Sequence, residues 1–374
     1  MYICLILSVF HLVLMMPCFG SVDIGKLSIE QKVGQLLIVH FNGEEVNPAA
    51  KLLVQQLGVG GIIYYNWSNG LYSPEQVQRL SSGLQNLAKD QANPIPLLIM
   101  VDQEGGRVAR LTQGFSSFPS NHEVGLADQP EYAERVAFSI ASELRAVGIN
   151  MNLAPVVDID EQGKPAYIGS RSFGDSPEKV ISCAKMALSG YRNAGIIAAL
   201  KHFPGHGSVK VDTHLDLPVL LKSKFELEER EFRPFRALVE EAEVIMTGHI
   251  LVPEIDAVNC ATLSKTLLDI LRKEIGYAGL IISDSLVMEG LLKNCECIDE
   301  AAIRAFNAGC DLLLLGGKQL QGSRESFELS EHDIHRIHKA ITAAVKNGLI
   351  SHERLNESVE RILRIKEKYM QFET

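Results

Sequence analysis

The sequence predicts an α/β fold, specifically a (β/α)8 barrel (TIM barrel) formed by a single domain. Eight short apolar runs alternate with stretches of helical periodicity along the 374 residues. The runs lack strict alternation of apolar and polar residues, which is typical of parallel strands covered by an outer ring of helices. A doubly wound open sheet is the less favoured alternative, because no Gly-x-Gly-x-x-Gly follows the first run. No linker rich in Pro, Gly or Ser divides the chain.

The expected strands and helices follow one another in regular order. The strands are expected at 35–40, 59–64, 97–101, 150–154, 196–200, 244–246, 279–282 and 310–315. The helices are expected at 74–88, 131–147, 177–193, 227–241, 265–274 and 299–308, with two closing helices at 332–347 and 353–370. The first of these helices begins Ser73-Pro74-Glu75, a serine cap followed by proline at the first helical position.

Composition limits the function classes. With 46% hydrophobic and 22% charged residues, the chain has the balance of a globular protein with a large core. The net charge of −10 argues against binding of nucleic acid or of an anionic membrane surface, which require clustered Lys and Arg. Among the seven cysteines, Cys183 and Cys310 fall in helix and strand patterns and are expected in the core.

The N-terminal segment resembles a secretory signal peptide spanning residues 1–20. Residues 2–16 are almost wholly apolar yet too short to span a membrane. In Cys18-Phe19-Gly20, the small residues lie at positions −3 and −1 of a cut before Ser21. The mature domain would then be 21–374, exported to the periplasm and without stable membrane insertion. Pro17 disfavours lipidation of Cys18. The alternative is an uncleaved hydrophobic N-terminus and a cytoplasmic location.

The segment from Lys201 to His214 is the predicted centre of the chemistry. It follows the expected strand 196–200, and Pro204 must end strand pairing because proline lacks the backbone donor. Asp212 lies close enough to His214 for its carboxylate to bind one imidazole nitrogen and leave the other for proton transfer. A zinc site is the minor alternative, with ligands drawn from His202, His206, Asp212 and His214.

Ionisable residues follow five consecutive strands, and in barrels of this kind the site is built at the strand C-termini. They are Asp102, Asp158, Lys201 with His202, His249 and Asp284. Asp284 is interpreted as a nucleophile that attacks a sugar carbon, with a helix cap as the alternative. Asp102 and Arg110 are expected to contact sugar hydroxyls, whereas Glu104 and Arg107 are expected to be structural.

In these motifs the chain resembles glycoside hydrolase family 3, and within it the single-domain β-N-acetylhexosaminidases of bacterial cell-wall recycling. The matching segments are Val101–Leu111, Arg171-Ser-Phe173, Lys201–Gly207 with Asp212-Thr-His214, and Ile282-Ser-Asp-Ser-Leu286. They run in order from the third expected strand to the seventh, so the resemblance covers essentially the whole mature chain. Ser285 and Ser170 depart from residues frequent in the family, but neither has a proposed chemical role.

The resemblance implies a reaction and a role for each site residue. Asp284 would form a covalent glycosyl-enzyme, and His214 would be the general acid/base, oriented by Asp212. A terminal N-acetylglucosamine would be held by Asp102, Arg110, Arg171, Lys201 and His202. The implied activity is retaining removal of N-acetylglucosamine from muropeptides without metal or cofactor. Phosphorolysis is an alternative, since a neutral histidine would let a phosphate anion approach the intermediate.

Overall fold

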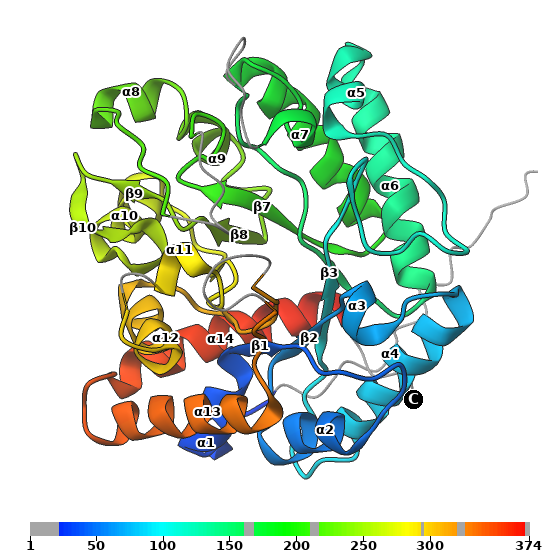
Figure 1. The fold of residues 1–374 in the computed structure, drawn as a ribbon, viewed down its shortest axis with the longest axis vertical. Helices are drawn as coiled ribbons and strands as arrows, with labels where there is room; N and C mark the ends of the chain where they lie inside the picture. The colour runs from blue at the N-terminus through cyan, green and yellow to red at the C-terminus, as the bar shows by residue number, and fades with distance from the viewer. Residues whose placement is uncertain (1–21, 161–167, 210–216, 293–294, 320–325, 371–374) are drawn as a thin grey trace, which may run out of the picture.

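The computed structural model describes residues 22–160, 168–209, 217–292, 295–319 and 326–370. Its centre is an eight-stranded parallel sheet in the order β11-β8-β7-β6-β3-β2-β1-β12 (Figure 1). The strands are β1 Leu37–Val39, β2 Gly61–Ile63, β3 Leu98–Val101, β6 Met151–Asn152, β7 Ile197–Phe203, β8 Val244–Thr247, β11 Leu280–Ile282 and β12 Leu313–Leu314.

The two ends of this sheet meet, so the sheet is a barrel. A parallel bridge joins Ile282, at the end of β11, to Leu312, just before β12. The N–H of Ser283 donates to the Leu312 carbonyl at 3.0 Å, which continues the ladder across the seam. Every strand lies close to its predicted position, and the prediction of a (β/α)8 barrel is confirmed.

Helices surround the barrel in the expected alternation (Figure 1). They include α1 Ile29–Leu36, α4 Pro74–Lys89, α6 Pro130–Ala146, α7 Pro177–Asn193, α10 Lys265–Asp269, α12 Ile298–Ala308, α13 Glu331–Lys346 and α14 His352–Tyr369. Their starts follow the sequence signals: the Ser73 hydroxyl caps α4 with proline at its first position, and Ser28 forms a capping box with Gln31 on α1. No helix of the described segments is long and apolar enough to cross a membrane.

Two element boundaries differ from the predictions. The helix expected at 227–241 is two short helices, α8 Lys224–Glu229 and α9 Arg233–Ala237, because Pro234 cannot continue a helix from the preceding turn and instead opens a new one. The strand expected to end at residue 200 continues to Phe203, so Lys201 and His202 lie within β7 and not in the loop after it.

Two hairpins and one buried histidine were not predicted from the sequence. The strands β4 Gln103–Gly105 and β5 Val108–Ala109 form one antiparallel hairpin, and β9 Leu251–Val252 with β10 Asp256–Cys260 forms another. On α13, His338 is 5% exposed and its Nε2 lies 2.9 Å from the Glu30 carbonyl. Cys183 and Cys310 are buried, as predicted.

The end of the barrel where the strands begin is closed by α14. The carboxylate of the fully buried Asp311 accepts hydrogen bonds from Arg272, Arg354, Arg361 and Ser358. In α14, the buried Lys366 ammonium donates to Gln35 Oε1 and to the Gly60 carbonyl, each at 2.8 Å. These contacts tie α14 to the barrel at the end opposite the candidate site.

Candidate active site

The residues after β3 are fixed by two buried amide side chains. Asn152, at the end of β6, accepts from the Gln103 N–H at 3.0 Å and donates to the Gln103 carbonyl at 2.8 Å. The Gln103 side chain accepts from the N–H groups of Arg110 and Leu111 and donates to the Leu111 carbonyl. The backbone on both sides of Asp102 is therefore held in one place.

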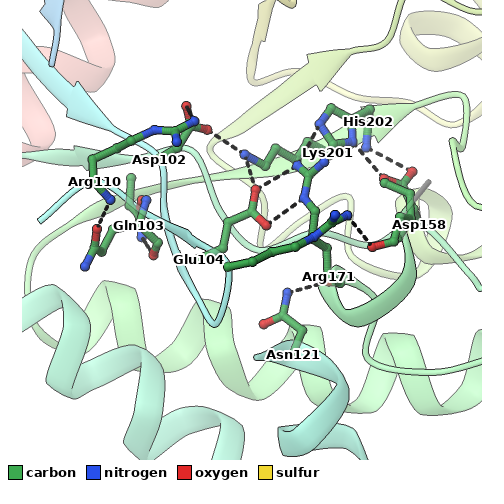
Figure 2. A network of polar contacts seen from close by, with 12 residues as sticks. Asp102, Gln103, Glu104, Arg110, Asn121, Asp158, Arg171, Lys201 and His202 are labelled. Atoms are coloured by element: carbon green, nitrogen blue, oxygen red, sulfur yellow. Dashed lines mark hydrogen bonds and ion pairs between the residues drawn. The ribbon is translucent and has the colours of Figure 1, made fainter. Parts of the chain in front are cut away.

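Glu104 is the centre of a buried ion network (Figure 2). Its carboxylate accepts a bidentate pair of hydrogen bonds from Arg171, 2.9 Å to Nε and 2.8 Å to Nη2, and lies 2.7 Å from Lys201 Nζ. The side chains of Glu104 and Lys201 are each 2% exposed. Burial alone would raise the pKa of Glu104, but the adjacent Arg171 and Lys201 cations outweigh it and hold this pKa well below its ordinary value. The carboxylate is ionised and already committed to these two cations.

Asp102 and Arg110 form the outward side of the same network. Lys201 Nζ donates to Asp102 Oδ1 at 2.7 Å, and the other oxygen of Asp102 lies 3.8 Å from Arg110 Nη2. The side chains of Asp102 and Arg110 are 17% and 33% exposed, against 2% for Glu104. Burial opposes the charge of Lys201, but Asp102 and Glu104 prevail and raise the pKa of Lys201 above its ordinary value. The exposed pair can contact a ligand, while the buried Glu104 holds Arg171 and Lys201 in place.

Arg171 reaches this network from a distant part of the chain. It ends the short helix η3 Gly169–Arg171, and its carbonyl accepts from Asn121 Nδ2 at 2.8 Å. Gly125, in α5 Asn121–Leu126, allows the close approach, since a Cβ there would lie 1.8 Å from the Phe173 carbonyl oxygen. With the Glu104 contacts, these interactions place the guanidinium beside His202 (Figure 2).

A bulge in β7 explains how two neighbouring residues face the same site. Lys201 pairs with Met246 and Phe203 pairs with the next residue, Thr247, so His202 is the extra residue between them. Successive side chains of a regular strand point to opposite faces, and a bulge re-aims one of them. Lys201 and His202 therefore both join the polar network, and the peptide bond between them is cis.

Asp158, which follows β6, is the buried anchor of the histidines. Its carboxylate lies 2.7 Å from His202 Nδ1 and accepts from the N–H groups of His202 at 3.1 Å and of His206 at 2.7 Å. A carboxylate can only accept, so His202 carries a proton on Nδ1. In the neutral imidazole, Nε2 is then an acceptor, and it lies 3.5 Å from Arg171 Nη2. Burial works against ionisation of Asp158, but His202 more than offsets it and lowers the pKa of Asp158.

The chain leaving β7 is also held against the Asp158 segment. A Cβ at Gly207 would lie 1.8 Å from the Ile159 carbonyl oxygen, so only glycine permits this approach. Burial, the largest influence on His206, lowers its pKa to about 4 despite the nearby Asp158. The predicted catalytic residues Asp212 and His214 lie outside the described residues, a few positions beyond this anchored stretch.

Asp284 follows β11 at the same end of the barrel and is half-buried. Its Oδ1 accepts from the Ser285 N–H at 2.7 Å. Burial raises the pKa of the Tyr65 phenol, and the negative charges of Asp102 and of Asp284 raise it further. The Tyr65 phenol is therefore influenced by both carboxylates, which follow β3 and β11 at the same end of the barrel.

A buried hydrogen-bond network, not predicted from the sequence, supports the Asp284 segment. His249 Nε2 donates to the Ser285 carbonyl at 2.9 Å, and its Nδ1 lies 2.8 Å from Thr262 Oγ1. Thr262 Oγ1 donates to the Gly248 carbonyl at 3.3 Å and lies 2.8 Å from Thr247 Oγ1. All three side chains are fully buried.

These observations define a class of protein. A (β/α)8 barrel carries, at its strand C-termini, one outward carboxylate after β11 and a set of paired cations and carboxylates suited to sugar hydroxyls. That combination is the one expected of a barrel glycosidase.

Residues 28–365 match the family model described as the glycosyl hydrolase family 3 N terminal domain. The chain belongs to glycosyl hydrolase family 3, so the predictions of the family and of a glycoside hydrolase are confirmed. It is 35% identical over 286 residues to the β-hexosaminidase of Nitrosomonas eutropha, covering 75% of this chain and 80% of that protein. It is 30% identical over 380 residues to β-hexosaminidase A of Pseudoalteromonas piscicida, covering 92% of this chain but 62% of that protein.

A solved structure agrees with the sequence relatives. The glycoside hydrolase family 3 β-N-acetylglucosaminidase of Paenibacillus sp. str. FPU-7 is 39% identical, with a TM-score of 0.85. The match covers 92% of this chain and 63% of that structure. The chain therefore spans less than two thirds of this relative and of the Pseudoalteromonas protein.

The structure brings together most of the residues that the sequence singled out. Asp102, Arg110, Arg171, Lys201 and His202 form one network, with Asp284 at the same end of the barrel. The sequence pattern missed the supporting residues Gln103, Asn121, Asn152 and Thr262. A signal existed for Asp158 and His249, each of which was noticed as an ionisable residue after a strand, but their contacts with His202 and Ser285 were not foreseen.

Proposed function

We propose that this chain is a retaining exo-β-N-acetylglucosaminidase that removes terminal N-acetylglucosamine from peptidoglycan fragments. The proposal is carried by one observation: Asp102, which pairs with Lys201 and Arg110, and Asp284 each follow a strand of the same parallel barrel, so both lie at its C-terminal end. The similarity to proteins named β-hexosaminidase and β-N-acetylglucosaminidase supports the choice of sugar.

The terminal sugar would be held by groups that differ in their roles. Asp102 accepts hydrogen bonds from sugar hydroxyls, and Arg110, Arg171 and Lys201 donate to them. His202, with its proton on Nδ1, offers Nε2 as an acceptor. Because Glu104 fixes two of the three cations before the sugar arrives, little side-chain entropy is lost on binding.

The reaction would proceed in two displacements. An Asp284 carboxylate oxygen attacks the anomeric carbon while the glycosidic oxygen leaves and takes a proton from His214, which gives a covalent glycosyl-enzyme. His214, now neutral and oriented by Asp212, then removes a proton from water as that water attacks the same carbon and releases Asp284. Two inversions restore the original anomeric configuration.

The test uses 4-nitrophenyl N-acetyl-β-glucosaminide and intact muropeptides. Asp284→Asn should abolish turnover of both, since the amide is not a nucleophile. His214→Ala should lose far more activity on muropeptides than on the nitrophenyl substrate, whose leaving group needs no proton. Full activity of Asp284→Asn would reject the proposal.

Two further arms separate the alternatives. Digestion with and without phosphate, with products identified by mass, distinguishes N-acetylglucosamine from its 1-phosphate and so distinguishes hydrolysis from phosphorolysis. Loss of activity after exhaustive chelation, with recovery on zinc addition, would favour the zinc hydrolase.

We further propose that the chain is exported and that residues 1–20, which lie outside the described residues, are removed. The support is the apolar segment and the small residues before Ser21. Cell fractionation followed by N-terminal sequencing tests this: a mature protein starting at Ser21 in the periplasmic fraction is expected, and an intact N-terminus in the cytoplasm would overturn it.

A further inference from the structure

An aromatic wall stands beside the candidate site. We use this name for His40, which follows β1, with Tyr65 and Trp67, which follow β2. The rings of Tyr65 and Trp67 are stacked, with centroids 5.1 Å apart and planes 18° apart. The His40 ring meets Trp67 edge-on at 5.1 Å. Trp67 is nevertheless 40% exposed, so a large flat apolar surface is offered at the mouth of the barrel.

Tyr65 connects this wall to the catalytic groups. It is 8% exposed, and burial together with the charges of Asp102 and Asp284 raises the pKa of its phenol. Its hydroxyl forms no hydrogen bond with any described residue. A Cβ at Gly316 would lie 3.5 Å from Tyr65 Cε2, and the Gly316 carbonyl accepts from Ser285 Oγ, so Tyr65 lies beside the segment of the proposed nucleophile and its hydroxyl can donate to a bound ligand. The aromatic wall therefore lies next to the proposed position of the terminal sugar.

Lys318 carries a positive charge onto the wall. It lies in the loop after β12, with Nζ 5.7 Å from the centroid of the Trp67 ring. Its backbone pairs with Glu328, but the Glu328 carboxylate instead accepts from Asn42 at 2.8 Å and faces His40 at 3.5 Å. Among the described residues, no carboxylate lies within ion-pair distance of the Lys318 ammonium.

The loop that bears Lys318 is attached to the segment of the proposed nucleophile. Ser285 Oγ donates to the Gly316 carbonyl at 2.6 Å, and Gln319 Nε2 donates to the Val287 carbonyl at 2.9 Å. Lys318 lies between these two contacts in the sequence. Its position is therefore fixed relative to Asp284, the residue next to Ser285.

We propose that Tyr65, Trp67 and Lys318 form the subsite for the second sugar, the one that leaves, and that Lys318 recognises a carboxylate on it. This inference rests on the proposed glycosidase function and adds a preference to it. A muramic acid residue without a stem peptide carries a lactyl carboxylate, whereas the second sugar of chitobiose carries none. The apolar face of the sugar would lie on Trp67, and the ammonium would pair with the carboxylate beside a ring that excludes water. The charge matters because a chain of net charge −10 otherwise repels an anionic ligand.

The chain offers a direct readout, because Trp67 is its single tryptophan. Titration of the purified protein with N-acetylmuramic acid should change the tryptophan fluorescence. In Lys318→Met the dissociation constant for N-acetylmuramic acid should rise by about tenfold relative to that for N-acetylglucosamine, as expected for loss of one charge-assisted contact. Lys339→Met, which removes an exposed lysine on α13, is the matched control and should leave both titrations unchanged.

Turnover supplies the second arm. The substrates are β-1,4-linked N-acetylglucosaminyl-anhydro-N-acetylmuramic acid and chitobiose. Lys318→Met should lower kcat/KM on the carboxylated disaccharide about tenfold more than on chitobiose. Equal losses on both disaccharides, or unchanged titrations, would overturn the subsite. Absence of turnover with an intact Lys318-dependent titration would overturn the proposed glycosidase function and leave the binding site in place.

Discussion

Replacing Glu104 by Gln tests whether the site is held by the charge of one buried carboxylate. The amide keeps the shape and one acceptor oxygen, but Arg171 then loses the carboxylate that it pairs with here, and Lys201 keeps only Asp102. Breaking a buried ion pair by removing one partner costs about 3–5 kcal/mol, and the remaining acceptor places the expected loss at about 3 kcal/mol. For 374 residues, the entropy of unfolding is about 0.8 kcal/mol/K, so Tm should fall by about 4 °C.

The activity of Glu104→Gln should fall with its stability. Both cations that the carboxylate positions are proposed to hold the sugar, and misplacing such groups by about 1 Å costs about a hundredfold in kcat/KM. Urea unfolding and initial rates on the nitrophenyl substrate measure the two effects. Glu360→Gln, an exposed change on α14, is the control and should stay within about 0.5 kcal/mol of the parent.

The pH dependence gives a second reading of the same carboxylate. Because its pKa is lowered in the folded state, its stabilising contribution is present above the ordinary value of 4.5 and is lost as pH falls toward the lowered pKa. The difference in unfolding free energy between parent and variant should persist at pH 5 and shrink only in stronger acid. A variant as stable and as active as the parent would refute the central role of Glu104.

Three further outcomes are expected. Burial lowers the pKa of Lys366 to about 7, so between pH 7 and 10 the side chain keeps its proton only in the unfolded chain. The free energy of unfolding of the parent should therefore rise by about 1 kcal/mol per pH unit over this range. In urea unfolding, Lys366→Met should lack this slope. Burial also lowers the pKa of His206 to about 4, so stability should fall by about 1 kcal/mol per pH unit from pH 6.5 to 4, and His206→Gln should flatten that stretch; an equal slope in the variant would contradict the assignment. Asp158→Asn should raise KM about thirtyfold on the nitrophenyl substrate, because the amide cannot accept all three donors that the carboxylate accepts; an unchanged KM would show that His202 needs no such partner.

The barrel could be predicted from the sequence because its evidence is local. Each strand is a short apolar run, and the helix starts carry visible caps such as Ser73-Pro74. The two failures have different origins, one local and one not. Pro234 can lie inside an apolar periodic pattern without breaking the pattern, although it breaks the helix. The bulge at His202 depends on pairing with β8, which no pattern within β7 can show.

The sequence predicted the position of the candidate site and the structural role of Glu104, but not the partners that give Glu104 this role. Residues after strands are expected to face the site, which identified Asp102 and Lys201. Burial separated Glu104 from Asp102, and burial depends on Arg171 arriving from 67 positions away in the sequence. The supporting amides Gln103 and Asn152 have no distinctive spacing, so nothing in the sequence set them apart.

Asp158 gives two stages of the proposed reaction a common dependence. Its carboxylate holds both the His202 imidazole, proposed to grip the sugar, and the His206 N–H, the first anchored point of the chain leading toward residues 210–216. The contact proposed to hold the sugar and the first fixed point of the chain beyond β7 therefore depend on a single carboxylate, so one substitution at Asp158 disturbs both at once.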